Sequence, residues 1–228
     1  KALYIETLID HHSTIMDKYD PEKKIGLICD EWGTWFTCEP GTNPGFLYQQ
    51  STMRDALVAG LSLNIFNKHC DRVKMANIAQ LINVLQAVIL TDGPRMLRTP
   101  TYHVFHMYKY HQDADLVESY LDGVETIGEE EEYMVPSLQE SVSIDKEGIL
   151  TITLNNLSVD KDEPVEISFA ECQTKEVTAA ILNNEMHAYN TFEDPDKVHE
   201  EVFSNYTVEN GMIRFTMPAS SVVQFRVR

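Results

Sequence analysis

The chain has 228 residues, of which 43% are hydrophobic, and this is enough for one large domain or two modest ones with a real core. Its 36 acidic side chains outnumber its 18 basic ones, and the net charge of -18 excludes nucleic acid and anionic membrane surfaces as expected partners. No apolar run approaches the roughly 20 residues that span a bilayer. The four cysteines lie far apart without metal-like pairing, and we interpret them as free thiols: Cys29, Cys38, Cys70 and Cys172.

A helix followed by a strand is predicted at the start of the chain. Apolar residues recur at helical spacing from Leu8 to Met16, and Asp20-Pro21 ends the pattern. The apolar run from Ile25 to Cys29 is short and is bounded by turn signals, which is typical of a strand covered on both faces in a parallel α/β sheet. A helix that leads into a buried strand is half of a repeated α/β unit.

Two adjacent carboxylates, Asp30 and Glu31, follow this strand, and residues 32–35 read Trp-Gly-Thr-Trp. Parallel α/β folds keep their chemistry at the carboxyl ends of strands. Glycosidases use one carboxylate to attack or to activate water and another to protonate the leaving oxygen, and flat aromatic rings stack on sugars. The stretch therefore favours carbohydrate chemistry. The alternative is that both acids pair with lysines or cap a helix.

The next segments predict a crossover to a second parallel strand. Residues 38–45 are rich in Pro and Gly and form a loop. A helix is expected from Tyr48 to Lys68, with an apolar stripe formed by Met53, Leu57, Leu61 and Ile65. Its polar flank contains Gln50, Arg54 and Asp55. Residues 72–80 predict the second strand, whereas the very apolar run from Leu81 to Leu90 fits helix and strand equally well.

Residues 91–94 predict a turn, and Thr99-Pro100 predicts an N-cap with proline at the first position of a helix that ends near His111. His103 and His106 stand three residues apart on this helix, a spacing that could ligate a metal. Because the sequence offers no third ligand, we expect them to pack or to lie on the surface.

The pattern changes near residue 115 to short alternating segments. Residues 141–145 and 149–154 flank the turn Lys146-Glu147-Gly148, which is a hairpin signature. Further strands are expected at Val165–Ala170, Val177–Leu182, Met212–Met217 and Val222–Val227. Repeated short strands of this kind indicate a β-sandwich.

Several motifs of the first half of the chain stand out together: Asp30–Trp35, Glu39-Pro40-Gly41, Arg54-Asp55-Ala56-Leu57, Leu63–Asn67 and Met75–Val84. Together they resemble one known family, the α-L-arabinofuranosidases of glycoside hydrolase family 51. The resemblance is to the carboxyl-terminal part of those enzymes, covers nearly the whole chain, and is most specific over residues 25–112. The closing run from Met217 to Val223 is similar to the last strand of the family's sandwich domain.

The resemblance implies a fold of two parts. Residues 1–114 would hold the last two β/α units of an eight-stranded (β/α) TIM barrel, with Ile25–Asp30 as strand seven and Val73–Ala79 as strand eight. Residues 115–228 would form a jelly-roll-like β-sandwich. The resemblance also implies that the preceding barrel strands lie in an N-terminal segment outside this chain, so the chain is expected to need that segment or a homo-oligomeric partner.

The resemblance assigns roles to individual side chains. It implies that Glu31 is the catalytic nucleophile of a retaining mechanism, that Trp35 forms a wall of the sugar subsite, and that Gln80 hydrogen-bonds the arabinose. Asp30 is expected to orient its neighbours, and Trp32 to pack or to line the cleft. No cofactor and no metal is implied.

The family's acid/base glutamate belongs to barrel strand four, which is outside this chain, so the chain alone is expected to be inactive. Glu39 is the nearest other carboxylate, but it lies in the Pro-Gly loop and is a poor replacement. The implied substrates are terminal α-L-arabinofuranosyl groups of arabinan or arabinoxylan oligosaccharides. The alternatives are a non-catalytic, sugar-binding or structural sandwich module, and a related glycosidase for β-glucans or xylosides. Both a cytoplasmic and a periplasmic or secreted location of a bacterial-type enzyme fit the sequence.

Overall fold

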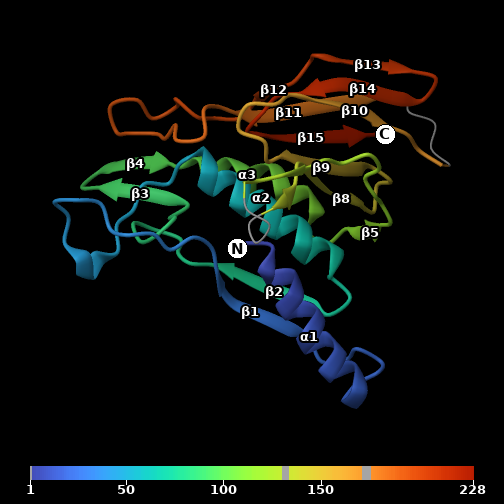
Figure 1. Cartoon of the computed structure of the whole chain (residues 1–228), viewed down its shortest axis with the longest axis horizontal. Helices are drawn as coiled ribbons and strands as arrows, with labels where there is room; N and C mark the ends of the chain where they lie inside the picture. The colour runs from blue at the N-terminus through green and yellow to red at the C-terminus, as the bar shows by residue number, and fades with distance from the viewer. Residues whose placement is uncertain (1, 130–133, 171–175) are drawn as a thin grey trace.

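The computed structural model describes residues 2–129, 134–170 and 176–228. Its elements form layers, with a two-stranded parallel sheet and the first helix on one side, the other helices in the middle and a larger β region on the other side (Figure 1). The helices are α1 (Tyr4–Tyr19), α2 (Met53–Lys68) and α3 (Pro100–Tyr108), with short 3-10 turns at Pro44–Phe46 and Lys109–His111. Within the described ranges, no helix is long and apolar enough to cross a membrane.

Within the described residues, the strands belong to five sheets. The first half of the chain contributes β1 (Leu27–Trp32), β2 (Val73–Ile78), β3 (Ile89–Asp92) and β4 (Arg95–Arg98). The six-stranded sheet contains β12 (Glu201–Val202), β11 (Val177–Asn183), β15 (Ser221–Val227), β9 (Leu150–Asn156), β8 (Leu138–Ile144) and β5 (Asp115–Val117), in this order. The remaining strands are β10 (Glu163–Ile167), β14 (Met212–Met217) and β13 (Tyr206–Glu209) in one sheet, and β6 (Thr126–Ile127) with β7 (Val135–Pro136).

The predicted crossover is confirmed, because β1 and β2 pair in parallel and α2 connects them. The expectation that the strand from Ile25 is covered on both faces is wrong. Ile25 is 63% exposed and Ile28 51% exposed. In the part of the chain that the structure describes, β1 and β2 form a sheet of two strands, and the helical core contacts Leu27 and Cys29 on one face.

A buried arginine fixes α1 to this strand pair. Arg72 is 1% exposed, and its guanidinium forms ion pairs with Asp17 and, at 2.8 Å, with Asp20 at the end of α1. Asp20 also accepts a hydrogen bond from the backbone N–H of Ile25 at 2.8 Å. That bond, together with Arg72, lowers the pKa of Asp20. The turn that the sequence predicts after α1 is therefore held by charge-assisted contacts.

Helix α2 is shorter and more buried than the sequence predicts. It begins at Met53 rather than near Tyr48, and its predicted apolar stripe is buried. Asp55, expected on the polar flank, has an exposed fraction of 0%. It sits at the third helical position, where its Oδ2 accepts the backbone N–H of Thr52 at 2.8 Å, so it satisfies a free donor of the first turn.

The segment between β2 and α3 resolves two other predictions. The run from Leu81 to Leu90 is mostly irregular, and only Ile89 and Leu90 enter β3. The turn at 91–94 is confirmed as the connection of the β3–β4 hairpin. Thr99 stands at the N-cap of α3, but its hydroxyl donates to the carbonyls of Ala87 and Val88 at 2.8 and 3.0 Å instead of capping the helix.

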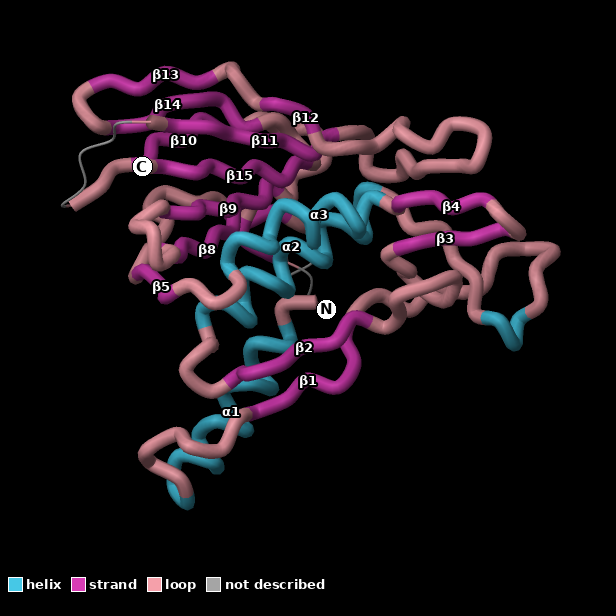
Figure 2. The backbone as a smooth tube through the Cα atoms, turned by 180° about the vertical axis from the view of Figure 1, so that it is seen from behind, coloured by secondary structure: helices cyan, strands magenta, loops and turns pink. Residues whose placement is uncertain are grey.

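The predicted β region is confirmed in outline. The 141–154 hairpin is β8–β9, and the other four predicted strands are β10, β11, β14 and β15, with ends shifted by up to three residues. The six-stranded and three-stranded sheets enclose a common core in which Phe203 and Phe225 pack at 6.2 Å between ring centroids. Figure 2 shows the same layers from behind, with α2 and α3 against the large sheet.

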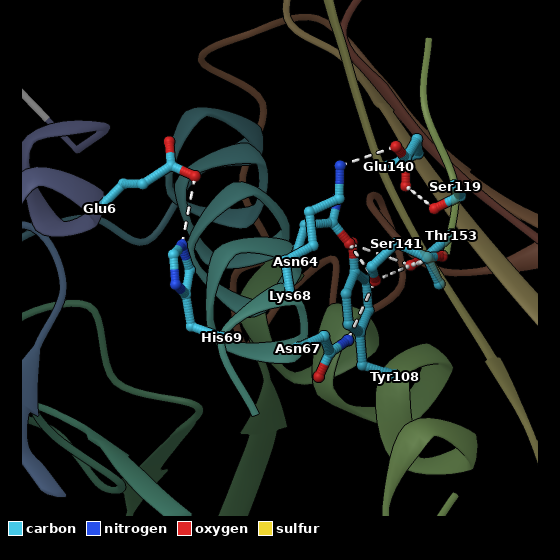
Figure 3. Close-up of polar contacts among 10 residues, drawn as sticks. All are labelled: Glu6, Asn64, Asn67, Lys68, His69, Tyr108, Ser119, Glu140, Ser141 and Thr153. Carbon is cyan, nitrogen blue, oxygen red and sulfur yellow. Dashed lines mark hydrogen bonds and ion pairs between the residues drawn. The ribbon is translucent and has the colours of Figure 1, made fainter. Parts of the chain in front are cut away.

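A buried polar network joins α2 to the large sheet, as Figure 3 shows. Oδ1 of Asn64 accepts hydrogen bonds from the hydroxyls of Tyr108, Ser141 and Thr153, at 2.9, 2.8 and 3.0 Å. Burial raises the pKa of the Tyr108 phenol, so this group stays a neutral donor. Lys68 pairs with the buried Glu140 at 2.7 Å at the end of the same helix. The two halves of the chain are thus packed together by specific polar contacts and not by apolar area alone.

Candidate active site at the carboxyl end of β1

A β-bulge presents the two acidic residues. Cys29 pairs with Ala76 and Trp32 pairs with Ile78, so that Asp30 and Glu31 together stand opposite one residue of β2. Residues three apart on a regular strand face opposite sides, yet Cys29 and Trp32 both contact the helical core. The bulge makes this arrangement geometrically consistent, and it leaves Asp30 and Glu31 exposed.

The other two predicted contact residues lie at the same end of the sheet. The backbone N–H of Ala79 donates to the carbonyl of Trp32 at 3.0 Å, so the carboxyl ends of β1 and β2 are joined. Gln80 follows directly and is exposed. Trp35 is 68% exposed, three residues after the end of β1. The structure therefore gathers Glu31, Trp35 and Gln80 on neighbouring chain segments with solvent-accessible side chains.

The sequence leaves two roles open for Trp32, packing in the core or lining the cleft, and in the structure Trp32 packs in the core. Its side chain is 5% exposed and lies between Phe105, stacked at 6.0 Å, and Phe66, edge-on at 5.5 Å. A ring enclosed by the helical core in this way cannot stack on a sugar. Trp32 fixes the end of β1 to α2 and α3, and it is Trp35 that offers an open aromatic face.

Buried polar side chains surround the loop after Glu31, and sequence reasoning missed them. Thr34 donates from its hydroxyl to Oδ1 of Asp55 at 2.6 Å and lies 3.2 Å from Oε1 of Gln86. Gln49 donates to the same hydroxyl at 3.0 Å. The exposed fractions are 2% for Gln49 and 0% for Asp55 and Gln86. In the sequence, a polar side chain near a predicted helix or loop is expected to be exposed. Only its contacts in the folded structure show that it is buried.

The remaining titratable candidates do not form a second site. Burial raises the pKa of the Cys29 thiol, which keeps it protonated and weakly nucleophilic. Cys29, Cys38 and Cys70 are free, as expected, while Cys172 lies outside the described residues. His103 is buried in the core, and His106 pairs with Glu200 at 2.5 Å on the surface. Among residues 2–129, 134–170 and 176–228, no group of three or more His, Cys, Asp or Glu side chains could hold a metal.

Comparison with known proteins extends over the whole chain. A family model described as the α-L-arabinofuranosidase C-terminal domain matches residues 30–221. The chain is 43% identical to an intracellular exo-α-L-arabinofuranosidase of Bacteroides ovatus, and the match covers 100% of the chain and 44% of that protein. The chain thus spans less than half the length of this relative.

Solved structures agree with the sequence comparison. The family 51 arabinofuranosidase of Xanthomonas axonopodis pv. citri superposes with a TM-score of 0.95 at 42% identity, over 100% of this chain and 46% of that one. A family 51 α-L-arabinofuranosidase of Bifidobacterium longum gives a TM-score of 0.86 at 24% identity, which supports the fold alone. The chain therefore belongs to the α-L-arabinofuranosidases of glycoside hydrolase family 51 and carries their C-terminal domain.

Proposed function

We propose that this chain supplies the nucleophile and part of the sugar subsite of a retaining exo-α-L-arabinofuranosidase. The observation that carries the proposal is the bulge in β1, which exposes Glu31 at the strand end while its neighbour Trp32 is held in the core. A rigid strand end fixes a reacting carboxylate better than a loop does. Family membership supports the reaction class, and the family 51 relatives that match are arabinofuranosidases.

In the proposed reaction, a carboxylate oxygen of Glu31 attacks the anomeric carbon of a terminal α-L-arabinofuranosyl group. The bond to the leaving oxygen breaks, and an acid on the opposite side protonates that oxygen. The residue that acted as the acid then deprotonates a water molecule, which attacks the anomeric carbon. Arabinose is released with retained configuration, and the carboxylate of Glu31 is restored. Retaining chemistry needs two carboxyl groups about 5 Å apart. We propose that the second one comes from barrel strands outside this chain, so the chain alone is inactive.

The subsite follows from the side chains around Glu31. We propose that Trp35 stacks on the apolar face of the sugar and that Gln80 hydrogen-bonds its hydroxyls, while Asp30 orients neighbouring groups without reacting. Residues 1–114 then form the last two units of a (β/α) barrel and residues 115–228 the β-sandwich. The acceptors are arabinan or arabinoxylan oligosaccharides, and the chemistry requires no cofactor.

The test compares two adjacent acids in a protein that contains this chain and the full barrel. Glu31→Gln is expected to lower kcat for an aryl α-L-arabinofuranoside by about 10⁴-fold or more, because covalent catalysis is lost. Asp30→Asn controls for the loss of one negative charge at the same bulge and is expected to retain most of the turnover. Azide should rescue Glu31→Ala and give an arabinosyl azide of inverted configuration. Undiminished turnover in Glu31→Gln would favour the alternative of a non-catalytic module.

A further inference from the structure

The loop that carries Trp35 is held by side chains and not by a regular element. Residues 33–36 leave the strand after the bulge, and Trp35 itself projects into solvent. Its two chain neighbours are both bound by Gln49. Oε1 of Gln49 accepts the backbone N–H of Phe36 at 2.8 Å, and Nε2 donates to the hydroxyl and the carbonyl of Thr34 at 3.0 and 3.4 Å. The buried amide of Gln49 thus binds the residues on both sides of Trp35.

Asp55 connects the same loop to the start of α2. Its Oδ1 accepts the hydroxyl of Thr34 at 2.6 Å, while its Oδ2 accepts the backbone N–H of Thr52 at 2.8 Å and lies 3.1 Å from Arg54. The carboxylate of Asp55 therefore caps α2 and also binds the loop that contains Thr34. The guanidinium of Arg54 in turn lies over the ring of Phe36, 3.8 Å from its centroid. Both flanks of Trp35 are consequently tied to the first turn of one rigid helix.

Gln86 connects the loop after β2 to the loop that carries Trp35. It is fully buried, and its amide fills the space that a side chain at residue 33 would need. A Cβ built on Gly33 would lie 1.5 Å from Nε2 of Gln86, and Gly33 has a φ of +137°, which disfavours any other residue. The backbone next to Gln86 is also bound to the loop between β1 and α2, because the N–H of Leu85 donates to the carbonyl of Leu47 at 3.0 Å. The loops that bear Trp35 and Gln80 are therefore fixed to each other.

We propose that Gln49, Asp55 and Gln86, the buried polar cluster, are positioning residues that set the place of Trp35 through Thr34. This inference rests on the proposed function, because it gives Trp35 a sugar to stack on. Glu31 is held separately by its strand, which pairs with β2. The cluster thus acts on sugar binding and not on the reacting atoms. A ring that stacks equally well on substrate and transition state raises KM when it is displaced and leaves kcat unchanged.

The test uses isosteric changes in the protein that contains the full barrel. Thr34→Val removes the hydroxyl and keeps the shape, whereas Thr34→Ser keeps the hydroxyl and should rescue. Gln49→Met removes all three hydrogen bonds of the Gln49 amide at similar volume. Thr34→Val and Gln49→Met are expected to raise KM about 10-fold or more, as for the loss of hydrogen bonds to buried partners, with kcat within about twofold. Thr34→Ser should stay within about threefold of the parent in both constants.

A matched control separates positioning from folding. Whereas the Thr34 side chain is half-buried, Ser141→Ala removes a fully buried hydroxyl that donates to Asn64 at 2.8 Å, on the other side of α2. It should lower stability and leave KM unchanged. The proposal is overturned if Thr34→Val behaves like Ser141→Ala, or if it lowers kcat at constant KM. Failure of the proposed function looks different, because Glu31→Gln would then keep its turnover whatever the cluster variants do.

Discussion

At the residue scale, the buried His103 and the half-buried His111 are expected to make stability depend on pH. Burial lowers the pKa of His103 and of His111 from 6.5 to about 4. The unfolded chain binds these protons more readily, so the contribution to stability is complete above about pH 6.5 and declines as the pH falls toward 4. We expect a loss on the order of 2 kcal/mol per histidine across this window in urea unfolding.

A pair of substitutions checks the assignment. His103 is 2% exposed, and within the described structure neither ring nitrogen has a hydrogen-bond partner. His103→Leu should therefore flatten the pH profile between 6.5 and 4 without loss of stability at neutral pH. His11→Leu, which replaces an exposed imidazole, is the control for the loss of one histidine. Equal profiles for His103→Leu and the parent protein would contradict the account.

At the same scale, the sequence identifies side chains by type but not by burial. Glu31, Trp35 and Gln80 were predicted from the motif, and the structure places all three at one sheet end. The helical pattern predicts Asp55 on the polar flank of the helix, and no motif in the sequence marks Gln49. Both side chains are buried in hydrogen bonds with Thr34, which donates to Asp55 and accepts from Gln49, and no local pattern encodes these contacts.

At the element scale, α2 approaches the large sheet through a glycine. A Cβ on Gly60 would lie 2.2 Å from Oδ1 of Asn155 in β9, whose amide donates to the hydroxyl of Tyr108 at 3.0 Å. Alanine is the better helix former by about 1 kcal/mol, yet this contact should dominate. Gly60→Ala is therefore expected to destabilise the protein by about 1 to 3 kcal/mol, measured by thermal unfolding.

A second substitution tests whether the contact is the cause. Asn155→Ala makes room at the helix, so Gly60→Ala should cost less in that background than in the parent, and the coupling should be at least about 0.5 kcal/mol. A rise in Tm for Gly60→Ala alone would show that helix propensity prevails. Strict additivity of the two changes would place the effect elsewhere.

Elements were predicted better than their ends. The apolar stripe predicts helix α2, but the first residue of the helix depends on the cap formed by Thr52 and Asp55. The run from Leu81 to Leu90 is apolar because Leu85 and Val88 are buried in an irregular segment, and periodicity carries no information there. The bulge at Asp30 was equally hidden, since it results from the register with β2.

At the scale of the whole molecule, the sheet formed by β1 and β2 and the segment just before β1 leave apolar side chains in water. Ile25, Ile28 and Met75 are 63%, 51% and 52% exposed. Exposed apolar faces and unpaired strand edges promote association. We expect the isolated chain to self-associate in light-scattering measurements, and Ile28→Lys with Met75→Lys to reduce the association. A monomer at concentrations on the order of 100 μM would contradict this.

We propose that Glu31 forms the bond to the sugar, and trapping of the glycosyl-enzyme intermediate would identify the residue that carries this bond. A 2-fluoro-arabinofuranoside with an activated leaving group slows hydrolysis of the covalent enzyme, because the fluorine destabilises the oxocarbenium-like transition state. Peptide mass spectrometry of the protein with its full barrel should then find the fluoropentosyl group on Glu31. A label on Asp30 or on any other residue, or turnover without a covalent intermediate, would show that Glu31 is not the nucleophile.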